Sequence, residues 1–522
     1  MTVTHPGLPD YWAGIIVAFM SLTILWVLAK PTPAQIRTSN LSLVKMPFVG
    51  NGIRQLVTSR WLLLSLKFVL VGFFLLIIYA GLFGTPIPER NFATMVTWNL
   101  WWSGLVFSVF FLGSAWCAVC PWDTLAQWLV RRKLWRRAEP NNSLNLKVPK
   151  WLANVWPALL MFIGLTWLEL GVGITTSPYA TAAVSLLMVV LATASLAIFQ
   201  RKAFCRYFCP VGRTVGYYSQ LAPIELRSID NDTCLNCTTL DCYHGNDKIE
   251  PCPTWLVMGR LKQNSYCTSC GNCTQSCPHE NIAWRFRPPS AEALHGARPH
   301  WDESWFMLGL LALTGFHGLT MMPFWEVWMS QLAQTIGDSG RLLPSFTIGL
   351  ILCLIIIAAI YSIFIAITKK IIDNEIHSDI HNNIEYKRLF SIFAFVSLPL
   401  AFAYHLAHNL NHLIRESVGI AAVFINPLGV DTVPLSMLEK HERHTTMWLS
   451  QDALFSIQAG LMIFGFWIAI QIIRYRGKNI ITKDADITDL KKSLKLTPML
   501  AFASGITAFH LWLLMQPMIM RM

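Results

Sequence analysis

The chain has 522 residues, of which 54% are hydrophobic and 13% are charged. Because soluble domains carry about 25% charged residues, this composition excludes an ordinary soluble enzyme and predicts a polytopic α-helical membrane protein. The net charge of +12 follows from basic loops between apolar stretches, so it indicates orientation in a membrane and not affinity for nucleic acid.

Apolar stretches of about 20 residues recur along the chain, and each can cross a hydrocarbon core of about 30 Å as a helix. We expect about ten such spans. They lie at 11–29, 61–84, 92–116, 151–174, 179–199, 303–325, 345–368, 389–414, 452–473 and 496–517.

Lys and Arg mark one side of the membrane. They gather in the loops 30–60, 117–150, 369–388 and 474–495, and the positive-inside rule makes these loops cytoplasmic. Both termini are then periplasmic. The N-terminal stretch MTVTHPGLPD lacks the basic region of a secretory signal, and neither a mitochondrial presequence nor a lipidation motif is recognisable, so we expect a multi-pass protein of the bacterial inner membrane.

A polar interval divides the expected spans. Residues 222–300 hold eight of the 13 cysteines and little apolar sequence, which predicts a cytoplasmic domain cross-linked by inorganic clusters. We therefore expect a membrane unit with two Cys-Pro hairpins at 1–221 and a bacterial-ferredoxin-like α+β domain with two [4Fe–4S] clusters at 222–300. A second membrane unit of five helices follows at 301–522.

The stretch YCTSCGNCTQSCPHE, residues 266–280, has the bacterial ferredoxin spacing C-x2-C-x2-C-x3-C-P. In this run three thiolates bind one cluster and the fourth reaches the neighbouring cluster. A looser run precedes it at 234–253. With this exchange of ligands, one cluster is bound by Cys234, Cys237, Cys242 and Cys277, and the other by Cys267, Cys270, Cys273 and Cys252. Structural zinc is the alternative, although two separated CxxC pairs would not need a further cysteine three residues on.

Two Cys-Pro motifs follow the helical hairpins 61–116 and 151–199, in WCAVCPWDTLAQWLVRRKLWRR and FCRYFCPVGRTVGYYSQL. In both, the proline can open a new helix. The four thiols lie at the same expected membrane face, where they could bind a third [4Fe–4S] cluster at the cytoplasmic boundary. They are Cys117, Cys120, Cys205 and Cys209. A redox-active dithiol pair and a structural metal stay open as alternatives.

These motifs resemble those of the polyferredoxin-type membrane iron–sulfur proteins that accompany periplasmic nitrate and nitrous oxide reductases, the NapH and NosR types. The resemblance spans roughly residues 61–290 and is carried by CAVCP, CRYFCPVG and the two ferredoxin runs. It implies electron transfer between the quinone pool or a cytoplasmic donor and a partner across the membrane, such as a periplasmic reductase or cytochrome subunit. CAVCP has two residues between its thiols where the family has three, and residues 300–522 lie outside the resemblance.

Histidines gather in the outward half of the expected spans. His405, His408 and His412 share one face of one helix, and His317 and His510 lie at similar depth. Ionisable residues in a span are costly and usually mark a site. A bis-histidine haem b would take its ligands from His317, His405, His408 and His510, whereas His412 is close enough to a helix end to be interfacial. A quinone or proton site and plain packing stay open.

The sequence therefore predicts membrane-bound electron transfer through [4Fe–4S] clusters, with haem b or a quinone as a further carrier. The chain would be an electron-transfer subunit of an oxidoreductase, with lipids and redox proteins as partners. The competing hypothesis is a transporter or a redox-sensing membrane regulator with a ferredoxin-type domain. The spans show no pair of interrupted helices of the kind that transporters use, and a sensor would not need so many thiols.

Overall fold

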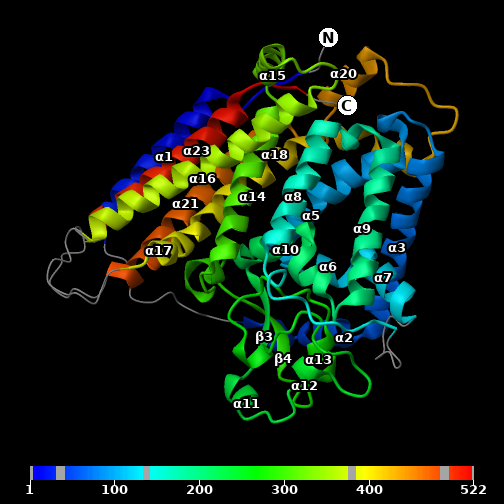
Figure 1. Cartoon of the computed structure of the whole chain (residues 1–522), viewed down its shortest axis with the longest axis vertical. Coiled ribbons are helices and arrows are strands. Elements are labelled where there is room, and N and C mark those ends of the chain that lie inside the picture. Colours follow the sequence, from blue (N-terminus) through cyan, green and yellow to red (C-terminus); the bar gives the residue numbers. More distant parts are fainter. Residues whose placement is uncertain (1–3, 31–40, 133–141, 374–383, 482–492, 520–522) are drawn as a thin grey trace.

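The described part of the chain is a bundle of long helices with a smaller Cys-rich region at one end (Figure 1). The computed structural model describes residues 4–30, 41–132, 142–373, 384–481 and 493–519. Helices dominate it, as the composition predicts, and the two longest strands lie in the Cys-rich region.

Eight helical segments of the described chain are long and apolar enough to cross a membrane. They are α1 (Asp10–Ala29), α3 (Arg60–Phe83), the run α4–η3–α5 (Phe92–Leu112), α9 (Pro178–Ile198), α16 (Leu343–Asp373), the run from α17 to α19 (Tyr386–Ile425), α21 (Gln451–Ile481) and α23 (Thr497–Met515). A ninth span results if α14 (Trp301–Thr320) and α15 (Pro323–Ile336), which meet at 93°, count as one.

The expected count of ten spans is not confirmed, for two local reasons. The segment expected at 151–174 forms α8 (Trp156–Thr166) and η4 (Trp167–Val172), a helix shorter than the other spans. The segment expected at 303–325 breaks, because Pro323 begins the new helix α15. Proline is favoured at the first helical position and disfavoured inside a helix, where its missing N–H leaves a carbonyl unpaired.

The helix α18 (Ser397–Glu416) lies at the centre of the second group of helices. It packs against α21 and α14, and every side chain from Ser397 to Asn411 is buried. A helix that is buried all round has no side left for lipid. His405 and His408 of α18 therefore face other helices.

The Cys-rich region is built on a three-stranded antiparallel sheet in the order β2-β4-β3. β3 (Ile224–Ser228) pairs along its whole length with β4 (Ile282–Phe286). The other edge of β4 pairs with β2 (Leu41–Ser42), which precedes the first helical hairpin. The helices around this sheet are α2 (Gly50–Thr58), α11 (Asn231–Leu235), α12 (Asp241–His244) and α13 (Asn272–Ser276).

A buried ion network ties the sheet to the helices. Glu225 on β3 lies 2.9 Å from Arg287, and Glu292 on η9 (Glu292–Gly296) lies 2.7 Å from Arg227 and also pairs with Arg287. Burial raises the pKa of Glu225, but Arg227, Arg287 and Arg285 together hold that pKa below its ordinary value. Arg476 on α21 donates to the carbonyl of Ala293 at 2.6 Å. The second group of helices is thereby joined to the Cys-rich region.

The two ends of the described chain meet at the opposite end of the bundle (Figure 1). β1 (Thr4–His5) pairs antiparallel with β5 (Met518–Ile519). Both termini thus lie away from β3 and β4, as the expected topology requires. Which side of a membrane each end faces stays a prediction, and part of each of the four basic loops lies outside the described residues.

Candidate functional site

The cysteines expected to bind the first cluster surround one cavity of about 190 Å³. Cys234 lies on α11, Cys237 in the loop after it, Cys242 on α12, and Cys277 follows α13. The amide of Asn281 donates to the Cys234 sulfur at 3.4 Å. The N–H of Leu240 lowers the pKa of the Cys237 thiol. Donors aimed at sulfur are the usual surroundings of iron–sulfur ligands, so these four residues fit a cluster.

The second expected set is more deeply buried. Cys252, Cys267, Cys270 and Cys273 lie close enough for their charges to interact, so the structure brings Cys252 to the three cysteines of the later run. Backbone N–H groups point at two of the sulfurs, from Leu256 to Cys252 at 3.3 Å and from Ser269 to Cys267 at 3.4 Å. This arrangement fits the second cluster with Cys252 as the exchanged ligand.

The third set joins the two Cys-Pro motifs. Cys117 lies on α6 (Trp116–Val119) and Cys120 immediately before α7 (Pro121–Arg131), while Cys205 lies on η6 (Phe204–Phe208) and Cys209 immediately before α10 (Pro210–Tyr218). Each of the four thiols influences at least one other across the hairpins. The convergence expected from the sequence is therefore present in the structure.

Helix ends and cations surround this third set. α7 and α10 both begin with proline right after a cysteine, so their positive N-terminal ends face the sulfurs. Burial raises the pKa of Cys117 to about 12 and that of Cys209 to about 11, while Arg213 lowers both. Isolated thiols here would stay protonated. Thiolates that bind iron would be stabilised by the metal, by Arg213 and by the N–H of Gly212, which donates to Cys209 at 3.2 Å.

The three cysteine sets are neighbours in space, in the order first, second and third. Cys242 of the first set interacts with Cys273 of the second. Between the second and third sets lies Lys202, which interacts with both Cys270 and Cys205 and pairs with Asp123 at 2.5 Å. The packing there is close, because a Cβ on Gly216 of α10 would come within 2.0 Å of the Ser265 carbonyl oxygen. A residue larger than glycine at position 216 would therefore push α10 and the segment before Cys267 apart.

Comparison with known proteins supports the iron–sulfur assignment. Residues 94–138 and 181–221 match the family described as a 4Fe-4S binding domain. These two segments contain the third cysteine set. This match supports [4Fe–4S] clusters as cofactors of the chain, as the sequence predicts.

Two curated proteins are similar to parts of the chain. "Putative electron transport protein YccM" of Escherichia coli is 29% identical over 159 residues, which are 30% of this chain and 40% of that protein. An uncharacterized protein of Methanocaldococcus jannaschii is 26% identical over 115 residues, 22% of this chain and 43% of its own length. The chain thus covers less than half of either relative. No solved structure matches it significantly.

The structure separates the candidate histidines into two environments. His405 lies against Trp102 of α5, and its Nδ1 is 3.3 Å from the hydroxyl of Tyr218 on α10. His510 on α23 stacks on Tyr404, with ring centroids 4.3 Å apart. His317 on α14 and His408, by contrast, come together with His412.

This arrangement does not fit a bis-histidine haem. Such a haem needs two imidazoles on opposite sides of the macrocycle. His408 and His412 approach each other at 3.1 Å from the same helix, and the rings of His405 and His510 are each packed against an aromatic side chain. His317 and His408 instead converge with His412 on one point, and the electron path proposed below does not pass through haem.

Sequence reasoning missed several residues around the sites. Lys202 and Arg213 sit next to Cys-Pro motifs, but only the fold shows that they face the sulfurs and not solvent. His412 was set aside because of its position near a helix end. Its i, i+4 spacing from His408 was the available signal, since such residues are neighbours on a helix surface.

Proposed function

We propose that this chain transfers electrons between a membrane quinone and a redox partner protein, through three [4Fe–4S] clusters in one line. The observation that carries this proposal is an apolar cavity of about 270 Å³ that adjoins the third cysteine set. It lies between α3, η3 (Met95–Trp101), α7 and α9, and Cys120 is part of its wall.

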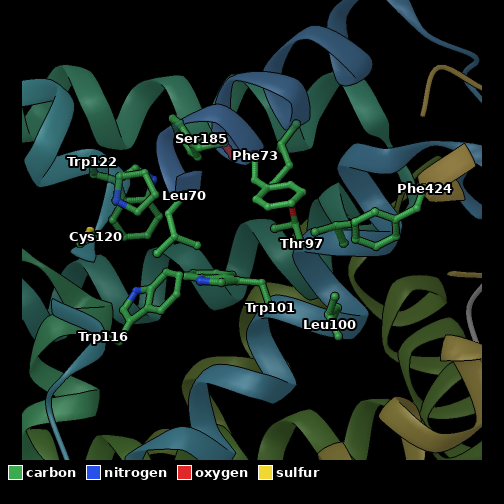
Figure 2. A pocket seen from close by; sticks show the side chains of 14 residues that line it. Leu70, Phe73, Thr97, Leu100, Trp101, Trp116, Cys120, Trp122, Ser185 and Phe424 are labelled. Carbon is green, nitrogen blue, oxygen red and sulfur yellow. The ribbon is translucent and has the colours of Figure 1, made fainter. Parts of the chain in front are cut away.

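The cavity extends from the cysteine toward the outside of the helical bundle. Figure 2 shows Cys120 beside Trp122 at one end and Phe424 at the other, with Phe73 and Thr97 between them. Phe73 and Phe424 are also exposed on the surface of the bundle. A lipid-soluble molecule could therefore enter from the bilayer and reach the neighbourhood of Cys120.

The lining suits a quinone ring and its isoprenoid tail. The walls are made of Leu, Ile, Phe and Trp side chains, with few polar groups, as ligand pockets of this kind usually are. The Thr97 hydroxyl is buried and has no hydrogen-bond partner among the described residues. A quinone carbonyl would satisfy this hydroxyl, which otherwise carries the cost of an unpaired buried polar group.

Each part of the chain then has a distinct task. When bound, [4Fe–4S] clusters act as one-electron carriers, whose potentials depend on nearby hydrogen bonds and charge. The three cysteine sets hold them in sequence from the cavity wall to the exposed face near Cys237. Arg213, Lys202 and the first turns of α7 and α10 place positive charge around the third set, which would favour its reduced state.

The setting and the partner are further parts of the proposal. Eight apolar helices support a multi-pass membrane protein, and the basic loops support a cytoplasmic Cys-rich region with both termini periplasmic. The similarity to a protein named for electron transport supports a redox partner. The resemblance of the motifs to the NapH and NosR types favours a periplasmic reductase or cytochrome as that partner.

Replacement of Thr97 by valine tests the quinone cavity. Because valine keeps the shape but removes the hydroxyl, we expect quinol-dependent reduction of the clusters to slow by about five- to tenfold, the loss of one hydrogen bond of about 1–1.5 kcal/mol. Stopped-flow absorbance with a soluble quinol measures this rate in the purified protein.

Thr193 on α9 provides a matched control. Its hydroxyl is also buried without a partner within the described residues, but Thr193 does not line the cavity. Thr193→Val should leave the rate unchanged. Equal rates for the wild type and Thr97→Val would contradict this site, and clusters that quinols never reduce or oxidise would favour a redox-sensing role for the chain.

A further inference from the structure

Three imidazoles converge between α14 and α18, away from all the cysteines. The ligand nitrogens of His317, His408 and His412 lie within 4.8 Å of one another. Within the part of the chain that the structure describes, this is the one group of His, Cys, Asp or Glu side chains whose three donor atoms approach so closely. From this geometry we propose that His317, His408 and His412 bind a first-row transition-metal ion.

The spacing of the nitrogens suits one shared ion. The Nε2 atoms of His408 and His412 are 3.1 Å apart. Two imidazole nitrogens at about 2.0–2.1 Å from a tetrahedral ion lie about 3.3 Å apart. His317 reaches the same point from α14, with its ring centroid 5.0 Å from that of His408. A hydrogen bond between two histidines would not require this third imidazole from another helix.

A carboxylate behind one of the imidazoles fits the pattern of a metal site. The Nδ1 of His412 is 2.7 Å from a carboxylate oxygen of Glu416, so Nδ1 carries the proton. The lone pair of Nε2 then faces the other two histidines. Glu169 lies 3.9 Å from the Nδ1 of His317, which is beyond hydrogen-bond distance. Histidines that bind metals usually donate their other N–H to such a carboxylate, which fixes the ring and strengthens the ligand.

An ion bound by the three histidines would have an open coordination position toward a neighbouring cavity. His317 and His412 line a cavity of about 260 Å³ that is also lined by Glu169, Asn409 and Met321. Three protein ligands with an open position are typical of metal sites that bind a further small molecule.

The backbone around the three histidines also departs from a regular α-helix. The cavity lies between two π-helical segments, η3 and η4, which supply Trp98 and Glu169 to its wall. Single π-turns are frequent at functional sites because they re-aim side chains that a regular α-helix would point elsewhere. Glu169, which lies near His317, is on such a turn. The metal site goes beyond the proposed electron path and depends on none of its cysteines.

Elemental analysis of the full-length protein, purified without oxygen in detergent, tests the proposal. After dialysis against Cu²⁺ or Zn²⁺ alone, we expect about one additional metal ion per chain, with the electron paramagnetic resonance signal of nitrogen-ligated Cu²⁺ in the copper sample. His408→Gln and His412→Gln should lose this ion. Glu416→Gln should retain it with affinity lowered by about 10- to 100-fold.

His405→Gln is the matched control, because His405 is a buried histidine of the same helix whose Nδ1 contacts the hydroxyl of Tyr218 and not the other three histidines. This variant should bind the ion like the wild type. The visible absorbance of the iron–sulfur clusters should be the same in all variants, which shows that they are folded and separates this test from that of the electron path. Absence of a bound ion in the wild type, or equal binding by His412→Gln, would overturn the proposal and leave a hydrogen-bonded histidine network.

Discussion

Simultaneous replacement of Cys117 and Cys205 by alanine should remove about four iron atoms per chain, because one ligand is lost from each hairpin of the third set. Quinol-dependent reduction of the remaining clusters should fall by orders of magnitude, since the carrier next to the apolar cavity is missing. Iron and acid-labile sulfide assays together with the quinol assay measure both effects. Neither thiol belongs to the sets that line the first two sites.

Cys353→Ala is the control for this experiment. Cys353 lies on α16, where its sulfur contacts the carbonyl of Ala312, away from all three sets. Its replacement should leave the iron content and the quinol reaction unchanged. An unchanged iron content in the Cys117 and Cys205 double variant would contradict a third cluster and point to a dithiol pair.

Arg287→Ala should destabilise the Cys-rich region by about 3–5 kcal/mol, the usual cost of removing one partner from a buried charge network. The guanidinium of Arg287 pairs with Glu225 and Glu292 and donates to the carbonyl oxygens of Ala222 and Ser219 at 2.9 and 2.8 Å. Without it, Glu225 and Glu292 each lose one buried cationic partner and keep Arg285 and Arg227, and the Ala222 carbonyl loses its guanidinium donor. Loss of cluster absorbance on heating or in denaturant measures the change.

Arg285 offers a comparison within the same network. It lies 2.7 Å from the other oxygen of Glu225 but its side chain is 25% exposed, against 2% for Arg287. Because water replaces an exposed partner, Arg285→Ala should cost only about 0–1 kcal/mol. Equal destabilisation by the two substitutions would show that burial does not govern this network.

The cysteine pattern allowed the most detailed predictions from the sequence. The spacing of the thiols in each run is local, so it survives folding, and the exchange of Cys252 and Cys277 follows from that spacing. Most apolar stretches could also be predicted, because a span is defined by its own residues, but the short helix at 156–172 and the break before Pro323 could not. The 4Fe-4S match at 94–138 and 181–221 agrees with the importance given to the two Cys-Pro motifs.

Features that depend on contacts between distant segments could not be predicted. Two residues of β2 carry no periodic signal, so their pairing with Arg285 and Phe286 was invisible in the sequence. The Thr97 hydroxyl and the cavity beside Cys120 arise only when four helices meet. The convergence of His317 with His412 depends on how α14 and α18 are rotated about their axes, which hydropathy does not determine.

The edge strand β2 sets a limit on how the Cys-rich region can be isolated. A fragment cut at residues 222 and 300 would lack Leu41 and Ser42, leaving the outer edge of β4 bare. Bare strand edges pair readily with another chain, so such a fragment would tend to self-associate. It would also lose α2 and the ion pair of Arg54 with Glu280 beside Cys277. A usable minimal unit therefore needs a linker that carries residues 41–58 back to β4.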